Sequence, residues 1–97
     1  MMYTYIIRCK DMSLYCGYTS DIDRRFKEHA SKIGAKYTRA KGVLRLEMYI
    51  KTDTKSSAMK LEYYIKKLSK NQKEKLIYGD DSLLINSCVD ILDIIRL

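Results

Sequence analysis

Tyr3-Thr4-Tyr5 and Tyr15-Cys16-Gly17 are the two stretches of sequence that decide the fold of this chain. They lie in two short apolar runs, residues 3–9 and 14–18, which are separated by the polar residues 10–13. Runs of this length, rich in aromatic and β-branched residues and joined by a polar turn, are typical of a β-hairpin. We therefore predict a hairpin of two tyrosine-rich strands.

The residues after the hairpin alternate between helical and strand patterns. Apolar residues recur at helical spacing in residues 21–32 and 54–68, whereas residues 43–51 alternate as a strand does. Ser69 and Gln72 have the spacing of a capping box and predict a short helix over residues 70–78. Glycines bound a basic loop at residues 34–42. This order, β-β-α-β-α-α, predicts an α/β (α+β) fold in which a small three-stranded sheet is flanked by helices.

The last residues differ from the rest in charge. Residues 1–78 carry 18 Lys and Arg against 8 Asp and Glu, a net +10, whereas residues 79–97 carry one arginine against four aspartates, a net −3. The helical spacing of apolar residues in 83–97 predicts a C-terminal helix. We expect residues 1–78 to form the main domain and residues 79–97 an extension that packs on it, with partner binding by the extension as the alternative.

Size and composition narrow the range of functions. The 97 residues suffice for one small domain, and no apolar run approaches the roughly 18 residues that cross a membrane. The first residues lack the basic and apolar regions of an export signal, so we expect a cytoplasmic protein. The net charge of +7 favours an anionic partner, nucleic acid first, although lysine-rich surfaces also occur on proteins that bind no nucleic acid.

The helix predicted after the hairpin carries two polar side chains that could take part in chemistry. Arg25 and His29 are four residues apart, so their side chains lie on one side of this helix. His29 is the single histidine of the chain. The buried side of the helix is expected to carry four apolar residues: Ile22, Phe26, Ala30 and Ile33.

Together these motifs resemble the signature of the GIY-YIG nuclease superfamily, in particular its small single-domain bacterial members. The resemblance extends over about residues 3–70 and rests on the two tyrosine motifs, Arg25, His29 and Glu62 in this order. The first motif lacks its leading glycine and isoleucine, and Cys16 replaces the isoleucine of the second, but these are packing positions. The resemblance implies a metal-dependent endonuclease that hydrolyses phosphodiester bonds in DNA, with branched or damaged DNA as candidate substrates.

The resemblance also implies roles for individual residues. Arg25 would contact the scissile phosphate, because a guanidinium fits a phosphate as a planar fork. Tyr5, Tyr15 and His29 would manage protons, and a phenol, whose ordinary pKa is near 10, acts as a base only if a cation such as Arg25 or a metal lowers that pKa. Which tyrosine acts is left open, and both could instead pack in the sheet. Tyr37 would assist the leaving group or stack on a sugar or base.

Glu62 is the residue to which the resemblance assigns a divalent metal, Mg²⁺ or Mn²⁺. It lies at the rim of the apolar stripe of the helix predicted for residues 54–68. Mg²⁺ is commonly held by one or two protein carboxylates together with waters and phosphate oxygens, so one glutamate suffices. The alternative is an ordinary salt bridge to Lys66, four residues further along.

DNA is the expected partner, and the basic loop is its expected contact. Lys36, Arg39 and Lys41 would position phosphates without reading sequence. Since we expect no separate DNA-targeting domain, selectivity would come from a targeting protein partner or from the structure of the substrate. The rival function is a non-catalytic nucleic-acid-binding module that keeps the fold. A protein-interaction domain built on the acidic tail is the third class.

Overall fold

One antiparallel sheet forms the centre of the molecule. The computed structural model describes residues 1–31 and 34–97, and within them the sheet has the strand order β2-β1-β3-β4. Its strands are β1 (Met2–Cys9), β2 (Leu14–Thr19), β3 (Val43–Thr52) and β4 (Ile91–Arg96). Strands β1 and β2 form the hairpin predicted from the tyrosine motifs, and β1 also pairs with β3.

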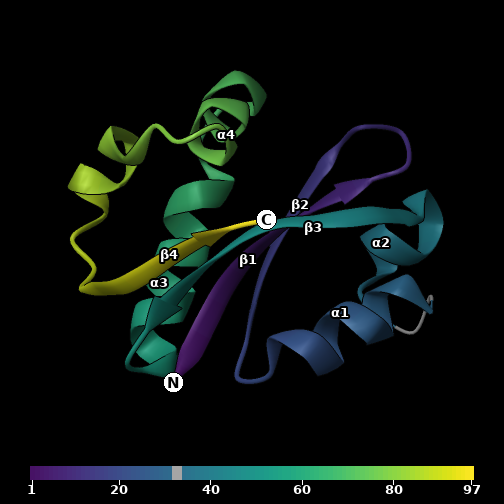
Figure 1. The fold of residues 1–97 in the computed structure, drawn as a ribbon, viewed down its shortest axis with the longest axis horizontal. Coiled ribbons are helices and arrows are strands. Elements are labelled where there is room, and N and C mark those ends of the chain that lie inside the picture. Colours follow the sequence, from purple (N-terminus) through teal and green to yellow (C-terminus); the bar gives the residue numbers. More distant parts are fainter. Residues whose placement is uncertain (32–33) are drawn as a thin grey trace.

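Helices cover both faces of the sheet (Figure 1). One face carries α1 (Ile22–Ala30) and α2 (Lys36–Lys41), and the other carries α3 (Lys55–Lys66), α4 (Lys70–Ile77) and the 3₁₀ helix η1 (Asp81–Ser87). The fold class predicted from the sequence, a small sheet flanked by helices, is confirmed. Among the described helices none is long and apolar enough to span a bilayer.

Polar side chains mark the starts of helices α1, α3 and α4. Asp21 accepts a hydrogen bond from a backbone N–H of the first turn of α1, and Thr54 does the same for α3. Ser69 and Gln72 form a reciprocal capping box at the start of α4. Such side chains satisfy N–H groups that have no partner within the helix.

The C-terminal helix predicted from the sequence is wrong, and so is the strand count. Residues 83–97 contain part of η1, a left-handed residue at Cys88 (φ 57°) and then β4, which pairs with β3 and makes the sheet four-stranded. The β-branched residues of Ile91–Arg96 favour a strand, and helical spacing over so short a segment does not exclude one. Leu84 is buried in the core, so deletion of residues 80–97 would remove a strand and a core side chain.

Two further expectations near α1 need correction. The basic segment 34–42 is not a loop but contains α2, which ends at Gly42 with φ 76°, a conformation that favours glycine. In α1 the buried residue is His29, whereas Ala30 is exposed. Lys32 and Ile33, which were expected to complete this helix and its apolar stripe, lie outside the described residues.

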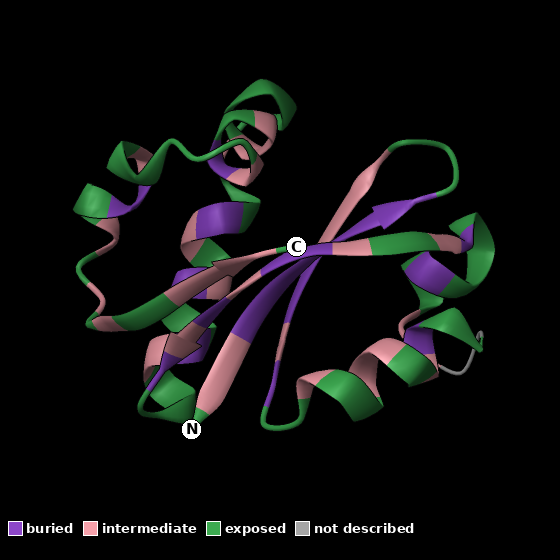
Figure 2. Ribbon diagram, viewed as in Figure 1, coloured by how far each residue is buried: buried purple, intermediate pink, exposed green. Residues whose placement is uncertain are grey.

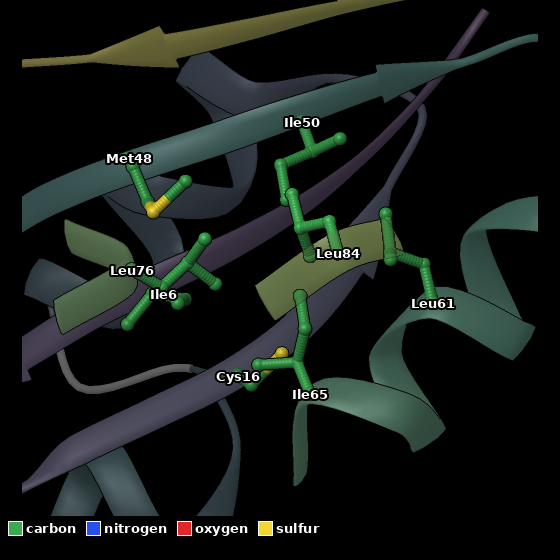
Figure 3. Packing of buried hydrophobic residues seen from close by; sticks show 8 residues of the cluster. All are labelled: Ile6, Cys16, Met48, Ile50, Leu61, Ile65, Leu76 and Leu84. Carbon is green, nitrogen blue, oxygen red and sulfur yellow. The ribbon is translucent and has the colours of Figure 1, made fainter. Parts of the chain in front are cut away.

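The side of the sheet under α3 and α4, which we call the apolar face, holds the hydrophobic core. Figure 2 shows buried positions along the central strands and the inner side of α3, and Figure 3 shows the side chains that meet there. They come from strands β1, β2 and β3 and from the covering helices: Ile6, Cys16, Met48, Ile50, Leu61, Ile65, Leu76 and Leu84. Of the stripe predicted for residues 54–68, Ala58, Leu61 and Ile65 are buried as expected, whereas Leu68 lies beyond the end of α3 and is half-buried.

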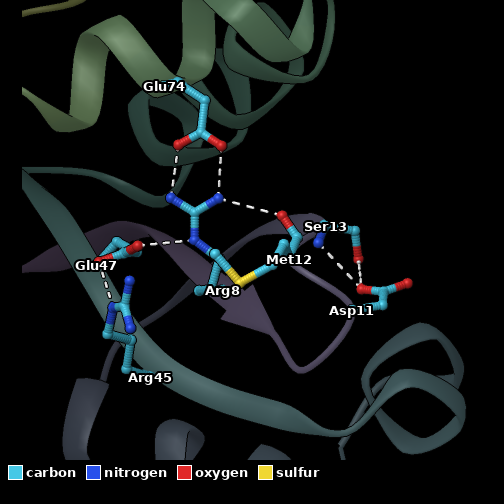
Figure 4. Close-up of polar contacts among 7 residues, drawn as sticks. All are labelled: Arg8, Asp11, Met12, Ser13, Arg45, Glu47 and Glu74. Carbon is cyan, nitrogen blue, oxygen red and sulfur yellow. Dashed lines mark hydrogen bonds and ion pairs between the residues drawn. The ribbon is translucent and has the colours of Figure 1, made fainter.

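A buried ion network lies at the other end of the apolar face (Figure 4). Arg8 donates to Glu47 at 2.8 Å and, through two nitrogens, to both carboxylate oxygens of Glu74 at 2.5 Å. The Arg8 guanidinium lowers the pKa of Glu74. Glu47 is buried at the position where the pairing of β1 with β3 shifts register, between Ile6 and Ile7 of β1.

Candidate active site

The hairpin turns two tyrosines toward α1 and α2, on the side of the sheet that we call the polar face. Tyr5 lies opposite Gly17 in the β1–β2 register, and Tyr15 lies opposite Ile7. Alternate residues of a strand share one face, so Tyr5 and Tyr15 point the same way. A Cβ atom on Gly17 would lie 2.5 Å from the Tyr5 hydroxyl oxygen, so the glycine of the second motif makes room for the Tyr5 phenol.

Helix α1 places His29 against Tyr5. Its Nε2 lies 2.8 Å from the Tyr5 hydroxyl, and its Nδ1 lies 2.6 Å from the hydroxyl of Thr38 on α2. The imidazole is 0% exposed. Burial, and then the positive charge of Arg25, lower the pKa of His29 to about 4. At neutral pH this side chain is therefore an uncharged imidazole with both nitrogens engaged.

Both tyrosines hold their protons tightly in this structure. Burial raises the pKa of Tyr5 to about 12, although Arg25 acts in the opposite direction. Burial also raises the pKa of Tyr15, against the lowering effects of Lys66 and Arg25. The sequence led us to expect a cation to lower a tyrosine pKa, and Arg25 does act that way, but desolvation of the phenolate outweighs it.

Tyr15 is the centre of the cluster. Its ring centroid lies 6.4 Å from that of Tyr5, 5.3 Å from that of His29 and 5.9 Å from that of Tyr37, on which it stacks at 26°. Tyr37 is 40% exposed, so its ring forms the outer end of the row. Residues from two strands and two helices thus form one aromatic cluster with polar edges.

Arg25 and Glu62 come from helices on opposite faces of the sheet. Arg25 is partly exposed, and its Nη1 lies 3.0 Å from a carboxylate oxygen of Glu28. Glu62 belongs to α3, on the opposite face of the sheet, and its carboxylate pairs with Lys66 Nζ at 3.2 Å. Lys66 Nζ in turn lies 5.9 Å from the centre of the Tyr15 ring. Since β2 is an edge strand, we infer that α3 reaches Tyr15 around the edge of the sheet.

The basic residues of α2 differ in their surroundings. Lys36 and Arg39 are exposed. Lys41 is exposed as well, but its Nζ is 2.8 Å from an Asp11 carboxylate oxygen and 5.7 Å from the Tyr37 ring centre. This ion pair holds the pKa of Asp11 well below its ordinary value. A phosphate would therefore compete with Asp11 for Lys41, but not for the other two cations.

Glu62 is the one residue of the predicted site that offers a divalent metal a carboxylate. Within the described residues no three or more His, Cys, Asp and Glu side chains are grouped to hold an ion. The Glu62 side chain is 21% exposed, so solvent reaches a hard oxygen ligand beside the Tyr15 cluster. This environment fits a Mg²⁺ or Mn²⁺ ion that takes its remaining ligands from water and a substrate phosphate. The salt bridge to Lys66, foreseen as the alternative, is also present.

Sequence reasoning assigned no site role to three residues that lie here: Thr38, Gly34 and Lys66, the last of which was expected only as a salt-bridge partner of Glu62. Thr38 contacts His29 directly, and Lys66 contacts both Tyr15 and Glu62. A Cβ atom on Gly34 would lie 2.4 Å from His29 Nδ1, so this glycine lets the chain pass close to the imidazole. The position of Lys66 one helical turn after Glu62 was a usable signal, whereas the part played by Thr38 depends on how α2 packs against α1.

Comparison with known proteins identifies a family and several relatives. A family model described as the GIY-YIG catalytic domain matches residues 1–75. UPF0213 protein BH0048 of Halalkalibacterium halodurans is 54% identical over 57 residues, which are 59% of this chain and 61% of that protein. UPF0213 protein HQ_3675A of Haloquadratum walsbyi is 47% identical over 57 residues, which are 59% of this chain and 64% of that protein. The aligned region thus spans about three fifths of these relatives.

A solved structure supports the same fold. The solution NMR structure of the UPF0213 protein BH0048 from Bacillus halodurans matches with a TM-score of 0.53 and 44% sequence identity. The match covers 93% of this chain and 100% of the other. The names of these relatives state no activity, substrate or metal.

Proposed function

This chain belongs to the GIY-YIG family, a nuclease-type family, and on that premise we propose that it is a divalent-metal-dependent endonuclease that acts on DNA in the cytoplasm. The observation that carries the proposal is the set of side chains around Tyr15, which joins both tyrosine motifs to His29 and to the Glu62–Lys66 pair. Hydrolysis of a phosphodiester needs an activated water, positive charge at the phosphate and help for the leaving oxygen. This cluster has groups for each.

Arg25 is the proposed phosphate clamp. Its guanidinium is partly exposed and keeps its charge at any working pH, and its fork matches two phosphate oxygens. Glu28 is its present partner, so phosphate binding would exchange one anionic partner for another. The neighbouring Arg24 is exposed on the outer side of α1 and is not part of the proposal.

Tyr5, Tyr15 and His29 are the proposed proton-handling groups, and Tyr37 is proposed to stack on a sugar or base or to assist the leaving group. The hydroxyl of Tyr5 is fixed by His29. Tyr15 stands between His29 and the exposed ring of Tyr37, nearer to solvent than Tyr5. An approaching phosphate would therefore meet Tyr37 and Tyr15 before Tyr5.

Glu62 is the proposed ligand of Mg²⁺ or Mn²⁺. When bound, the ion would supply positive charge to the phosphate oxygens. Lys66 would then have to give up part of its contact with the Glu62 carboxylate, because both cations need the same oxygens. Lys66 remains close to Tyr15 in either case and adds a positive charge on that side of the site.

DNA contact is proposed for the basic surface of α2. Lys36 and Arg39 would hold phosphates beside Tyr37, and Lys41 would do so after leaving Asp11. Such contacts are not sequence-specific and weaken as salt is added. Selectivity would then come from branched or damaged substrate structure or from a targeting protein partner.

The test is cleavage of branched and plain duplex DNA by the purified chain with Mg²⁺ or Mn²⁺. We expect cutting that stops on addition of a chelator and is lost in Glu62→Gln, which keeps the shape of the side chain but not its charge. Asp53→Asn, which removes one negative charge from an exposed position before α3, is the matched control and should cut like wild type. Cleavage by Glu62→Gln at the wild-type rate would refute the metal assignment.

A non-catalytic nucleic-acid-binding module is the second candidate, and the Glu62–Lys66 ion pair favours it. A carboxylate already paired with a lysine needs no metal. This function predicts binding whose logarithm falls steeply with the logarithm of salt concentration. It also predicts that neither a chelator nor Glu62→Gln changes the binding, and that wild-type protein cuts none of the DNA substrates.

A further inference from the structure

The hydroxyl group of Thr38 has one hydrogen and two neighbours, which fixes the direction of its hydrogen bonds. Thr38 is completely buried, with Oγ1 2.9 Å from the carbonyl oxygen of Ala35 and 2.6 Å from Nδ1 of His29. A carbonyl only accepts, so the hydrogen of Thr38 is donated to Ala35. In the opposite arrangement the oxygens of Thr38 and Ala35 would face each other at 2.9 Å with no hydrogen between them, which is costly.

The state of the imidazole follows from this. Thr38 can only accept from His29, so Nδ1 carries a hydrogen. His29 is neutral at pH 7, because burial and Arg25 lower its pKa to about 4, so its other nitrogen is bare. Nε2 then accepts the hydrogen of the Tyr5 hydroxyl at 2.8 Å. The bonds run in one direction, from Tyr5 through His29 and Thr38 to Ala35.

We propose that Thr38 is a positioning residue of the site, which holds His29 in its Nδ1–H tautomer and thereby directs the Tyr5 hydrogen at His29. The oxygen of Tyr5 can then only accept hydrogen bonds from groups on its other side, such as Arg25 or a water beside it. For its role in catalysis this inference rests on the proposed function. The hydrogen on Nδ1 rests on the hydrogen-bond geometry, and the bare Nε2 follows because the imidazole is uncharged at pH 7.

The close approach of Gly34 is a second observation, beside the hydrogen bonds, which indicates that the His29 imidazole has a fixed orientation. A Cβ atom at this position would lie 2.4 Å from Nδ1, 2.9 Å from Cγ and 3.0 Å from Cα of His29. The backbone of Gly34 therefore leaves the ring no space to move toward it. With Tyr5 and Thr38 at its two nitrogens and Gly34 beside it, His29 has one orientation.

The tautomer can be measured directly, because His29 is the single histidine of the chain. Full-length protein labelled with ¹⁵N-histidine gives one set of imidazole signals in long-range ¹H–¹⁵N NMR spectra. At neutral pH we expect a protonated Nδ1 and a bare Nε2. A protonated Nε2, or an imidazolium, would overturn the proposal whether or not the protein cuts DNA.

Variants of Thr38 link the tautomer to activity. Thr38→Val removes the acceptor of Nδ1–H, so we expect a population with hydrogen on Nε2. We also expect a rate of cleavage lowered about 10- to 100-fold, the size of loss known for the hydrogen-bond partners of metal-bound histidines. Thr38→Ser keeps the hydroxyl and should restore the tautomer and most of the lost rate. Thr52→Val, at another fully buried threonine, is the matched control and should change neither.

Tyr5→Phe keeps the proposal testable if Thr38→Val does not fold. It removes the donor to Nε2 but not the acceptor of Nδ1–H, so His29 should keep its tautomer. Loss of the Nδ1–H signal in Tyr5→Phe, or its persistence in Thr38→Val at the wild-type cleavage rate, would refute the role of Thr38. A wild-type chain with the Nδ1–H tautomer that cuts no DNA would refute the proposed function and sustain the hydrogen-bond assignment.

Discussion

The two faces of the sheet bury side chains in different ways. On the apolar face the side chains of the core are held by removal of apolar surface from water, which requires shape but no partner atoms. On the polar face Tyr5, His29 and Thr38 are just as buried, but each makes a hydrogen bond to the next. A buried polar group without a partner costs free energy, so this face depends on specific pairs of atoms.

Strand β1 takes part in both faces and connects them. Ile6 enters the core, while Tyr5 contacts His29 on the other side of the sheet. Packing on the apolar face can therefore fix the register of β1, and that register determines where side chains such as Tyr5 lie on the polar face. Substitutions that shorten core side chains on the apolar face should lower stability, and those at the exposed edge of the polar face should lower activity alone.

The largest effect is expected in the core. Leu61→Ala removes a completely buried side chain of α3 and should lower the free energy of unfolding by about 2–5 kcal/mol, since it leaves a cavity. Met59→Ala on the same helix removes a side chain that is 47% exposed and should cost less than about 0.5 kcal/mol. Urea unfolding followed by circular dichroism measures both. Equal losses in the two variants would mean that the core is packed differently from the structure.

A comparably large effect, but on activity, is expected at Arg25. Arg25→Gln should lower the cleavage rate about 100- to 1,000-fold, as the loss of one group that stabilises transition-state charge does. Arg24→Gln removes the same charge from the adjacent exposed position and should cut nearly as well as wild type. Both proteins should unfold at the wild-type temperature. If the two variants lost activity equally, overall charge and not a phosphate clamp would explain the effect.

Much of the fold could be predicted from the sequence because its signals are local. The hairpin, the capped start of α4 and the apolar stripe of α3 each follow from neighbouring residues. Strand β4 could not be predicted in this way, because its pairing with β3 depends on contacts far apart in the sequence. The basic segment 34–42 gave too few apolar positions to indicate α2.

The sequence indicated which side chains of the site lie near one another, but not their burial or protonation. Tyr5, Tyr15 and His29 lie in one cluster, and the i, i+4 spacing of Glu62 and Lys66 predicted their ion pair. The burial of His29 and the high pKa of Tyr5 depend on how closely α1 packs on the sheet, which sequence spacing does not reveal. The chemical roles of these residues remain predictions.

The pH dependence of stability tests whether burial lowers the pKa of His29 in the folded chain. An unfolded histidine has a pKa near 6.5, whereas that of His29 is about 4 in the folded chain, so the unfolded state binds the proton first. Above pH 6.5 the uncharged His29 makes its full contribution to the free energy of unfolding. As the pH falls toward 4, this contribution falls by on the order of 3 kcal/mol.

The measurement is urea unfolding of wild type and His29→Gln at a series of pH values from 7.5 to about 4. The difference between the two should shrink toward low pH. Glu74, whose pKa is lowered by Arg8, titrates in both proteins, so its contribution cancels. A constant difference across the range would show that His29 titrates like an exposed histidine.

The smallest effect on the free energy of unfolding is expected from the same substitution, threonine to valine, made on each face of the sheet. Thr52 shares the face of Ile50, and its buried hydroxyl has no hydrogen-bond partner among the described residues. Thr52→Val should therefore leave the free energy of unfolding within about 1 kcal/mol of wild type, with stabilisation the expected direction, because a buried hydroxyl without a bond gains nothing. Thr38→Val strips the partner from a buried N–H and should cost about 1–3 kcal/mol. Urea unfolding of both proteins gives the comparison, and equal changes at the two threonines would mean that the polar face does not depend on the Thr38–His29 bond.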